Sequence, residues 1–483
     1  MFTFKRPYFG LRGGWLTFWI TLACGADMTL YGYDQGVFSG VVISQDFLRL
    51  HQLEGPSKTT LLGTVAAIYD VGCFLGSIFA YWLGERLGRK NTVLLGTAIM
   101  STGALLQAAS YSLGQMLAGR IIAGIGNGLN TSTAPIWQVE TSKAQFRGKL
   151  VILENVLVLV GFSLANWLNY GFSFANGPVS WRFPLAFQFF FIIILIFTVP
   201  WLPESPRWLV SHGHGNQAVQ IIADLEDRDT NDPFVQLQMS EIEYSVEYEQ
   251  ANSVSFSDIL HGRAHEKSGT KTARRLILGM GESLARLLTA CNSVQYLFFS
   301  MIGIPSVERY GRRVLLMFGA AGMCFCYIFI TSLIRYNELS GYPHRQEVAS
   351  ASVAFFFLYY VFFGIGMQGV PWCAALGAAT NWIFNFMVVE ITPICIQNLG
   401  WRFYIVWVVL NAAMIPVIYV FYPETAGRTL EDMDDYYRGN PPLLACLDKE
   451  GISSKRPQRY SVRDEHSVLA KERGETAQHL ETA

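Results

Sequence analysis

The sequence predicts an all-α membrane protein whose two halves repeat one another. Of its 483 residues, 51% are hydrophobic and only 15% are charged, whereas soluble domains carry about 25% charged residues. Apolar windows long enough to cross a bilayer recur along the chain, and two charged motifs each occur twice at nearly the same spacing. Together these features indicate a duplicated bundle of membrane-spanning helices.

A spanning helix needs about 20 mostly apolar residues, and the chain offers eleven such windows, six in its first half and five in its second. The windows of the first half are 15–43, 60–83, 92–112, 115–137, 151–173 and 184–202. Those of the second half are 284–306, 314–334, 350–372, 374–397 and 401–422. We therefore expect two six-helix bundles, of which the second lacks one span.

The sidedness of the chain follows from its basic residues, which gather in alternate connections such as 85–90 and 308–313. The opposite connections, for example 173–180, carry no Lys or Arg. By the positive-inside rule the basic connections face the cytosol, and so do both termini. We expect a multi-pass protein of the plasma membrane.

The repeated motifs show where the halves differ. ERLGRK at 85–90 recurs as ERYGRR at 308–313, and the Pro-Glu at 203 recurs at 423. Between Arg275 and Glu308, both expected on the cytosolic side, the chain has a single window, which crosses the bilayer only once. Either a helix is absent, or 276–307 forms a re-entrant element, or the later helices are inverted. We favour absence, which makes the missing helix the seventh span.

The windows and polar stretches divide the chain into four regions. We predict an N-terminal transmembrane bundle (1–205), a cytosolic helical loop (206–275), an incomplete C-terminal transmembrane bundle (276–425) and a cytosolic tail (426–483). Within the loop, helical apolar spacing is recognisable at 216–227 and 234–248.

Two ionisable residues inside the predicted spans indicate proton chemistry, because a charge at the bilayer centre costs about 2.5–3.5 kcal/mol on the insertion scale. Asp34 lies in GYDQGV of the first window, and Arg120 opens the fourth in AGRIIAGIGNG. A carboxylate whose arginine partner moves can release and rebind a proton. We predict a proton-coupling pair, and a fixed ion pair that only assembles the bundle is the alternative.

Other acids in the windows have less specific expectations. Glu154 is predicted either to contact solute hydroxyls or to be a carboxylate near the cytosolic interface at the start of its helix. Asp27 and Asp70 are expected to line an aqueous path or to bond polar neighbours, and Glu390 has no assigned role.

The two charged loops are predicted to close the cytosolic side of the molecule. Ion pairs at the cytosolic helix ends that break and re-form suit a two-state gate. The alternative is that these charges only fix the topology of the chain in the membrane. The predicted gate residues are Glu85, Arg86, Arg89, Glu140, Arg147, Glu204, Arg207, Glu308, Arg312, Glu424 and Arg428.

Several stretches combine into a family signature. They are GYDQGVFSG at 32–40, the two charged loops, PIWQVETSKAQFRG at 135–148, PESPRWL at 203–209 and PETAGRTLEDM at 423–433. Together they resemble the sugar porter branch of the major facilitator superfamily, in wording closest to its fungal members, over about residues 15–433.

The resemblance implies a major facilitator fold with a central solute site and alternating access. Asp34 and Arg120 match positions tied to proton coupling in symporting members. Trp372 and Asn381 match positions that contact sugar, and Asn155 lies near a further sugar contact in the fifth span.

The chain departs from the family pattern in two places. The family's seventh span, which carries Gln-Gln and Gly-x-Asn sugar contacts, is missing. It should lie between Gly281 and Glu282. The charged cytosolic connection after VPW is also missing, since Trp372 and Cys373 run straight into AALGAATNW.

The resemblance implies transport of a sugar or polyol, coupled to protons, with the lipid bilayer as surroundings. A non-transporting sensor or an inactive splice product of such a transporter is the alternative. No nucleophile with a base, phosphate loop or metal-ligand set is recognisable, so we expect no enzyme activity, no cofactor and no metal. A net charge of -1 provides no field to recruit nucleic acid.

Overall fold

The protein is described by a computed structural model, in which the chain divides into two compact units. One unit comprises Met1–Phe298 with Pro371–Phe403, and the other comprises Phe299–Val370 with Tyr404–Ala483. The structure describes residues 7–251 (without 56, 57, 144–146 and 176), 309–338, 345–366, 374–424, 444–448 and 451–453, besides the single residues 299, 306, 436 and 442.

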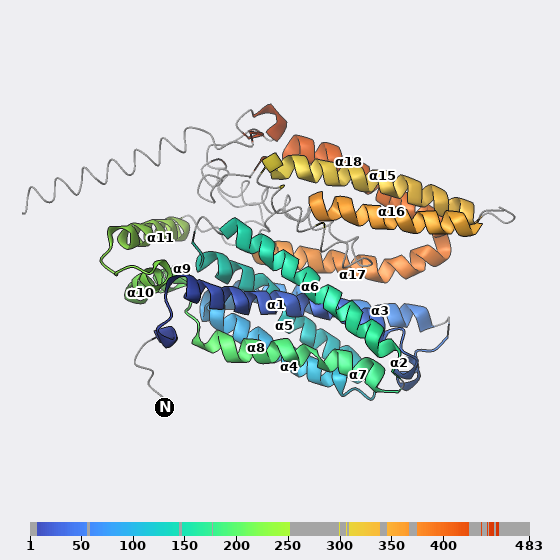
Figure 1. Cartoon of the computed structure of the whole chain (residues 1–483), viewed down its shortest axis with the longest axis horizontal. Coiled ribbons are helices and arrows are strands. Elements are labelled where there is room, and N and C mark those ends of the chain that lie inside the picture. Colours follow the sequence, from blue (N-terminus) through green and yellow to red (C-terminus); the bar gives the residue numbers. More distant parts are fainter. Residues whose placement is uncertain are drawn as a thin grey trace, which may run out of the picture. The chain divides into compact units, whose positions relative to one another are not determined.

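Long helices dominate the first unit (Figure 1). They are α1 (Gly13–Val41), α3 (Thr59–Leu87), α4 (Arg89–Ala108), α5 (Leu113–Glu140), α6 (Arg147–Ser173), the broken pair α7 (Val179–Ala186) and α8 (Gln188–Thr198), and α17 (Ala374–Leu399). The short helix α2 (Gln45–Leu50) connects α1 to α3, and the 3-10 turns η1 (Pro7–Gly10) and η4 (Val199–Trp201) flank the bundle.

The described part of the second unit contains α15 (Arg312–Glu338), α16 (Arg345–Gly366) and nearly all of α18 (Phe403–Phe421). The 3-10 turn η5 (Gly400–Arg402) leads into α18, and η6 (Ala445–Leu447) follows later in the chain. Helices α15 and α16 pack closely, with Gly319 of one against Gly366 of the other.

Helices occupy every predicted window that falls among the described residues. The window 284–306, and with it the question of the missing span, lies outside the described residues. The window 184–202 was placed too late, because its helix begins at Val179 and is interrupted at Phe187. Ser180 and Arg182 lower the hydropathy of this first turn, and at the interruption the Pro184 carbonyl accepts a hydrogen bond from the Tyr33 hydroxyl at 2.7 Å.

Among the described residues, five helices are long and apolar enough to cross a membrane. They are Leu61–Leu87, Leu153–Ser173, Val179–Trp201, Arg312–Tyr336 and Gly400–Phe421. Helices α1 and α5 are as long but carry buried polar residues such as Asp27 and Asn130, which lower their hydropathy. Large apolar side chains project outward, including Trp15 at 69% exposure and Phe197 at 71%, as expected of a surface that faces lipid.

Glycines allow the helices of the first unit to approach closely. A Cβ on Gly32 of α1 would overlap the Val158 carbonyl of α6, and one on Gly124 of α5 would overlap the Tyr69 carbonyl of α3. Small residues at such crossings let the backbones touch and replace the hydrophobic driving force that lipid removes.

The described part of the predicted cytosolic loop, up to Ala251, contains the helices α9 (Pro206–Ser211), α10 (Gly215–Glu226) and α11 (Pro233–Ala251). The two helices predicted here are confirmed as α10 and α11, and α10 buries its apolar face as its spacing requires. Ion pairs hold α10 to the bundle: Arg12 to Asp224 at 3.1 Å and Lys143 to Glu226 at 2.9 Å.

Candidate functional site

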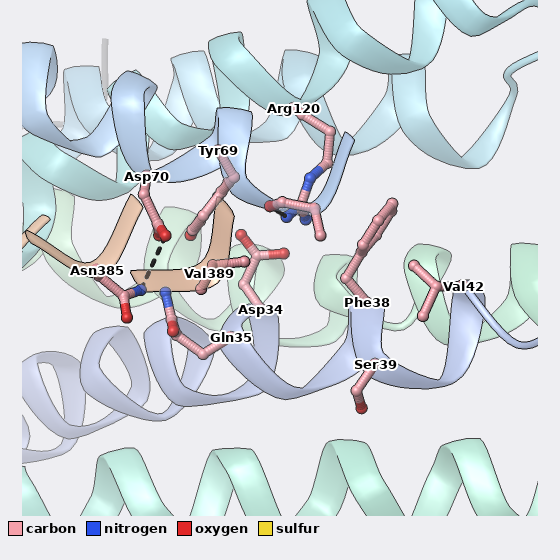
Figure 2. Close-up of a pocket in the computed structure, with 11 residues that line it drawn as sticks. Asp34, Gln35, Phe38, Ser39, Val42, Tyr69, Asp70, Arg120, Asn385 and Val389 are labelled. Atoms are coloured by element: carbon pink, nitrogen blue, oxygen red, sulfur yellow. Dashed lines mark hydrogen bonds between the residues drawn. The ribbon is translucent and has the colours of Figure 1, made fainter. Parts of the chain in front are cut away.

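A polar cavity of about 180 Å³ lies among α1, α3, α5 and α17 of the first unit (Figure 2). That volume far exceeds the roughly 10–15 Å³ that a single water needs. The cavity is lined by Asp34, Gln35, Phe38, Ser39, Val42, Ala66, Tyr69, Asp70, Arg120, Asn385 and Val389. The structure therefore brings the predicted pair Asp34 and Arg120 to one site.

Asp34 is buried at 1% exposure, on the face of α1 that points into the cavity. Within the described residues, neither of its carboxylate oxygens has a hydrogen bond of good geometry, and the Tyr69 hydroxyl lies near enough to interact with the carboxylate. A buried carboxylate without hydrogen bonds is costly to ionise. The charge of Asp34 therefore depends on the groups around it, which include the guanidinium of Arg120.

Arg120 enters the cavity from α5 and is buried at 3% exposure. Its Nε donates to the Val65 carbonyl at 3.3 Å and its Nη2 donates to the Ala66 carbonyl at 2.6 Å. The guanidinium also lies over the Phe38 ring, 3.9 Å from its centroid. Arg120 is thus held by the α3 backbone and by an aromatic face, and the fixed Asp34–Arg120 ion pair, the alternative to coupling, is not formed in this structure.

Four further residues of the cavity are Gln35, Tyr69, Asp70 and Asn385. Asp70 is buried at 4% exposure, and its Oδ2 accepts a hydrogen bond of 2.9 Å from Asn385 Nδ2 of α17 (Figure 2). The Tyr69 hydroxyl points toward Asp34 in the same view. Of these four residues, the sequence singled out only Asp70. Its expected role of bonding a polar neighbour is confirmed.

A second polar contact joins α3 to α17. The Thr64 hydroxyl donates to Glu390 Oε1 at 2.9 Å. Glu390, which had no assigned role, thereby links two helices that are more than 300 residues apart in the sequence.

Two of the residues predicted to bind solute, Glu154 and Asn155, are not among the residues that line this cavity. Glu154 and Asn155 lie on α6, where Glu154 is buried close to Asp27 of α1. Asp27 accepts a hydrogen bond of 2.8 Å from Asn130, in keeping with its expected polar role. Asn381 lies on α17, but its side chain is outside the described residues, as is all of Trp372. Solute contact at these positions stays a prediction.

The first charged loop forms a network with the end of the following spans. Arg89 pairs with Glu140 of α5 at 3.1 Å and with Glu85 at 3.8 Å. Glu204 accepts the backbone N–H of Arg89 at 2.8 Å and of Lys90 at 3.1 Å. Glu204 therefore caps the N-terminus of α4, because a carboxylate satisfies the free N–H groups of a helix start. We had expected Glu204 to pair with charged side chains instead.

The second charged loop repeats that cap. Glu424 accepts the backbone N–H of Arg312 at 2.9 Å and of Arg313 at 3.1 Å, at the start of α15. The guanidinium of Arg86 lies over the Trp82 ring, 3.9 Å from its centroid, and Arg207 lies on α9. Glu308, Arg428 and the side chain of Arg147 are outside the described residues.

The long apolar helices and the charged side chains buried among them are those of a multi-pass membrane protein. The family model described as "Sugar (and other) transporter" matches residues 19–297 and 278–437. The chain belongs to this family, whose fold is that of the major facilitator superfamily.

Two relatives are similar over nearly the whole chain. The MFS-type transporter oryC of Aspergillus oryzae is 53% identical, over 96% of this chain and 93% of the relative. The sugar transporter STL1 of Saccharomyces cerevisiae is 31% identical, over 90% of this chain and 83% of the relative. The first alignment runs over 506 positions, while 96% of this chain is about 464 residues, so about 42 aligned positions have no counterpart here.

Solved structures share the fold. The proton:xylose symporter XylE bound to 6-bromo-6-deoxy-D-glucose superimposes with a TM-score of 0.71 at 21% identity, covering 87% of this chain and 99% of that one. A partially occluded inward-open conformation of XylE from E. coli gives a TM-score of 0.68 at 22% identity, covering 86% of this chain and 99% of that one. The predicted fold class is confirmed.

Proposed function

We propose that this chain transports a sugar or a polyol together with protons, by alternating access. The observation that carries the proposal is the burial of Asp34 and Arg120 in one cavity without a mutual ion pair. The sugar-transporter family of the chain supports the class of solute.

Proton coupling follows from the electrostatics of this cavity. The charge on Asp34 is favoured by a guanidinium nearby and disfavoured by burial. Arg120 is held by carbonyls of α3, so a shift of α3 relative to α1 would change the distance between the two charges. Asp34 then binds its proton in one conformation and releases it in another, which links proton movement to the conformational cycle.

Uptake by reconstituted vesicles tests this function. Purified chain in liposomes should accumulate labelled hexoses or glycerol when the outside is acidified, and Asp34→Asn should abolish the stimulation by acid. Asp27→Asn is a matched control, because Asp27 is an equally buried carboxyl of α1 that does not line the cavity. Acid stimulation that survives Asp34→Asn would overturn the coupling role.

A non-transporting sensor or inactive splice product is the second candidate. It is favoured by the family model, which matches in two segments that overlap at 278–297, where the sequence predicts the missing span. The unmatched positions in the alignment with oryC agree. Solute binding without flux would support this candidate, and insertion of the corresponding segment of oryC between Gly281 and Glu282 should then restore uptake.

We further propose that the two charged loops close the cytosolic side and that both termini face the cytosol of a plasma-membrane protein. The repeated caps at Glu204 and Glu424 support a structural link between each loop and the end of its half. Epitope tags at both termini should be reached by antibody only after the cells are permeabilised. Labelling of intact cells would contradict this topology.

A further inference from the structure

The cavity contains more negative than positive groups. Asp34 and Asp70 are two carboxyls, and Arg120 is the one guanidinium among the lining residues. All three are at least 96% buried. In a low-dielectric site one guanidinium cannot balance two carboxylates, and the surplus charge is relieved when one of them takes up a proton.

The surroundings of Asp70 differ from those of Asp34. Asp70 faces Asp34 on α1, Arg120 on α5 and the uncharged Asn385 on α17, with Tyr69 and Cys73 as titratable neighbours on its own helix. The Nδ2 of Asn385 donates to Asp70 at 2.9 Å. Among the described residues, Arg120 Nη1 has no hydrogen-bond partner although it is buried, so the cavity holds an unused donor.

We propose that Asp70 is a second proton-binding residue of this cavity and that its ionised form tightens the contact of α3 with α17 through Asn385. A hydrogen bond to a carboxylate is about twice as strong as one between neutral groups. Loss of the Asp70 proton therefore strengthens the Asp70–Asn385 bond, and protonation weakens it. Thr64 and Glu390 provide a neighbouring link between the same helices. This inference rests on the proposed proton-coupled function and adds a residue to it.

Infrared titration of the purified full chain in lipid nanodiscs tests the proposal, whether or not the chain transports. The carbonyl stretch of protonated carboxylic acids is recorded while the pH is raised. The wild-type chain should lose a component of this band that is missing from Asp70→Asn at every pH. A wild-type minus Asp70→Asn difference without a titrating carboxylic-acid band would overturn the proposal.

The variant Asn385→Ala separates proton binding by Asp70 from a purely structural role of Asp70. It also provides a test if Asp70→Asn does not fold. Without this amide donor, the ionised form of Asp70 loses one of its hydrogen bonds and keeps the one from Gln35, so the Asp70 component should persist to higher pH. Asp27→Asn is the control and should leave that component in place. An unchanged midpoint in Asn385→Ala would refute the link to α17.

Transport measurements distinguish the proposed proton-coupled transport from the proposed role of Asp70. If wild-type uptake is not stimulated by acid, the proposed function fails while the infrared result for Asp70 stands on its own. If uptake is stimulated by acid and Asp70→Asn leaves its pH profile unchanged, the role of Asp70 in coupling is refuted and the function is kept.

Discussion

The two halves of the chain build the same helix cap around their charged loops. The two residues after Gly88 donate their backbone N–H groups to Glu204, and the two residues after Gly311 donate theirs to Glu424. Both glycines have positive φ, 87° and 84°. The backbone geometry of the loop and its carboxylate cap are thus repeated together.

The halves differ in the side chains that surround this cap. In the first half the Arg89 guanidinium bonds Glu140 of α5. In the second half Arg313, which stands where the first half has Lys90, donates to the Tyr419 carbonyl of α18 and lies over the Tyr419 ring, 5.1 Å from its centroid. The comparison indicates that the backbone cap is needed to build each half, whereas the side chain at the second capped position, Lys90 in one half and Arg313 in the other, differs between them.

The largest effect is expected from Gly88→Ala and Gly311→Ala. At Gly88 (φ 87°, ψ 168°) the backbone lies in a region open almost only to glycine, at a cost of about 1–3 kcal/mol for other residues. An added Cβ would also overlap the Glu204 or Glu424 carboxylate and disturb the cap. Thermal unfolding in detergent should show strong destabilisation in both halves, whereas Gly114→Ala, in open space, should not. Unchanged thermal stability of Gly311→Ala would show that the two loops are not equivalent.

The next largest effect is expected from removal of the caps. Glu424→Ala and Glu204→Ala each leave backbone N–H groups without their charged acceptor, which costs about 1.5–3 kcal/mol. Glu424 is buried at 1% exposure and should be the more sensitive of the two. Glu54→Ala, which removes an exposed partner of Arg49, is the control in the same unfolding assay. Equal stability of Glu424→Ala and wild type would show that the cap is dispensable.

A smaller effect is expected from Glu140→Gln, which acts on the first half alone. The Arg89–Glu140 pair is partly buried, with side-chain exposures of 17% and 12%, and loss of its charge should cost about 1 kcal/mol. A double-mutant cycle with Arg89→Lys measures the coupling. A coupling energy of zero would show that this pair does not stabilise the first half.

The smallest effect concerns pH. Burial raises the pKa of Glu204 above its usual 4.5, although N–H donors from Ser205, Lys90 and Arg89 partly oppose the rise. The folded state therefore binds this proton more tightly than the unfolded state, and stability falls as the pH rises from 4.5 through the raised pKa. Glu204→Gln should flatten this part of the unfolding profile. An identical slope in wild type and variant would contradict the assignment.

The sequence predicts the helices well because lipid imposes a simple rule on them. A span must be apolar over about 20 residues, and the windows that become α3, α6, α15 and α18 follow it. The rule fails at α7, whose first turn carries Ser180 and Arg182 and lies before the apolar run. Polar residues at a helix end are invisible to a hydropathy window.

The candidate site was only partly predictable. Asp34 and Arg120 stand out because charges are rare inside spans. Asn385 carries no charge, and its meeting with Asp70 depends on the packing of α17 against α3, across 315 positions of sequence. The role of Glu204 was missed for a related reason, since a motif shows which charges are present but not that a carboxylate will choose backbone N–H groups.

The central claim is that the Asp34 cavity couples solute to protons, and proton movement is its most direct test. Liposomes that contain the purified chain and an internal pH indicator should acidify inside when a transported sugar or polyol is added outside. The account predicts this acidification in the wild type and Asp27→Asn chains and its absence in Asp34→Asn. Solute entry without any change of internal pH in the wild type would contradict it.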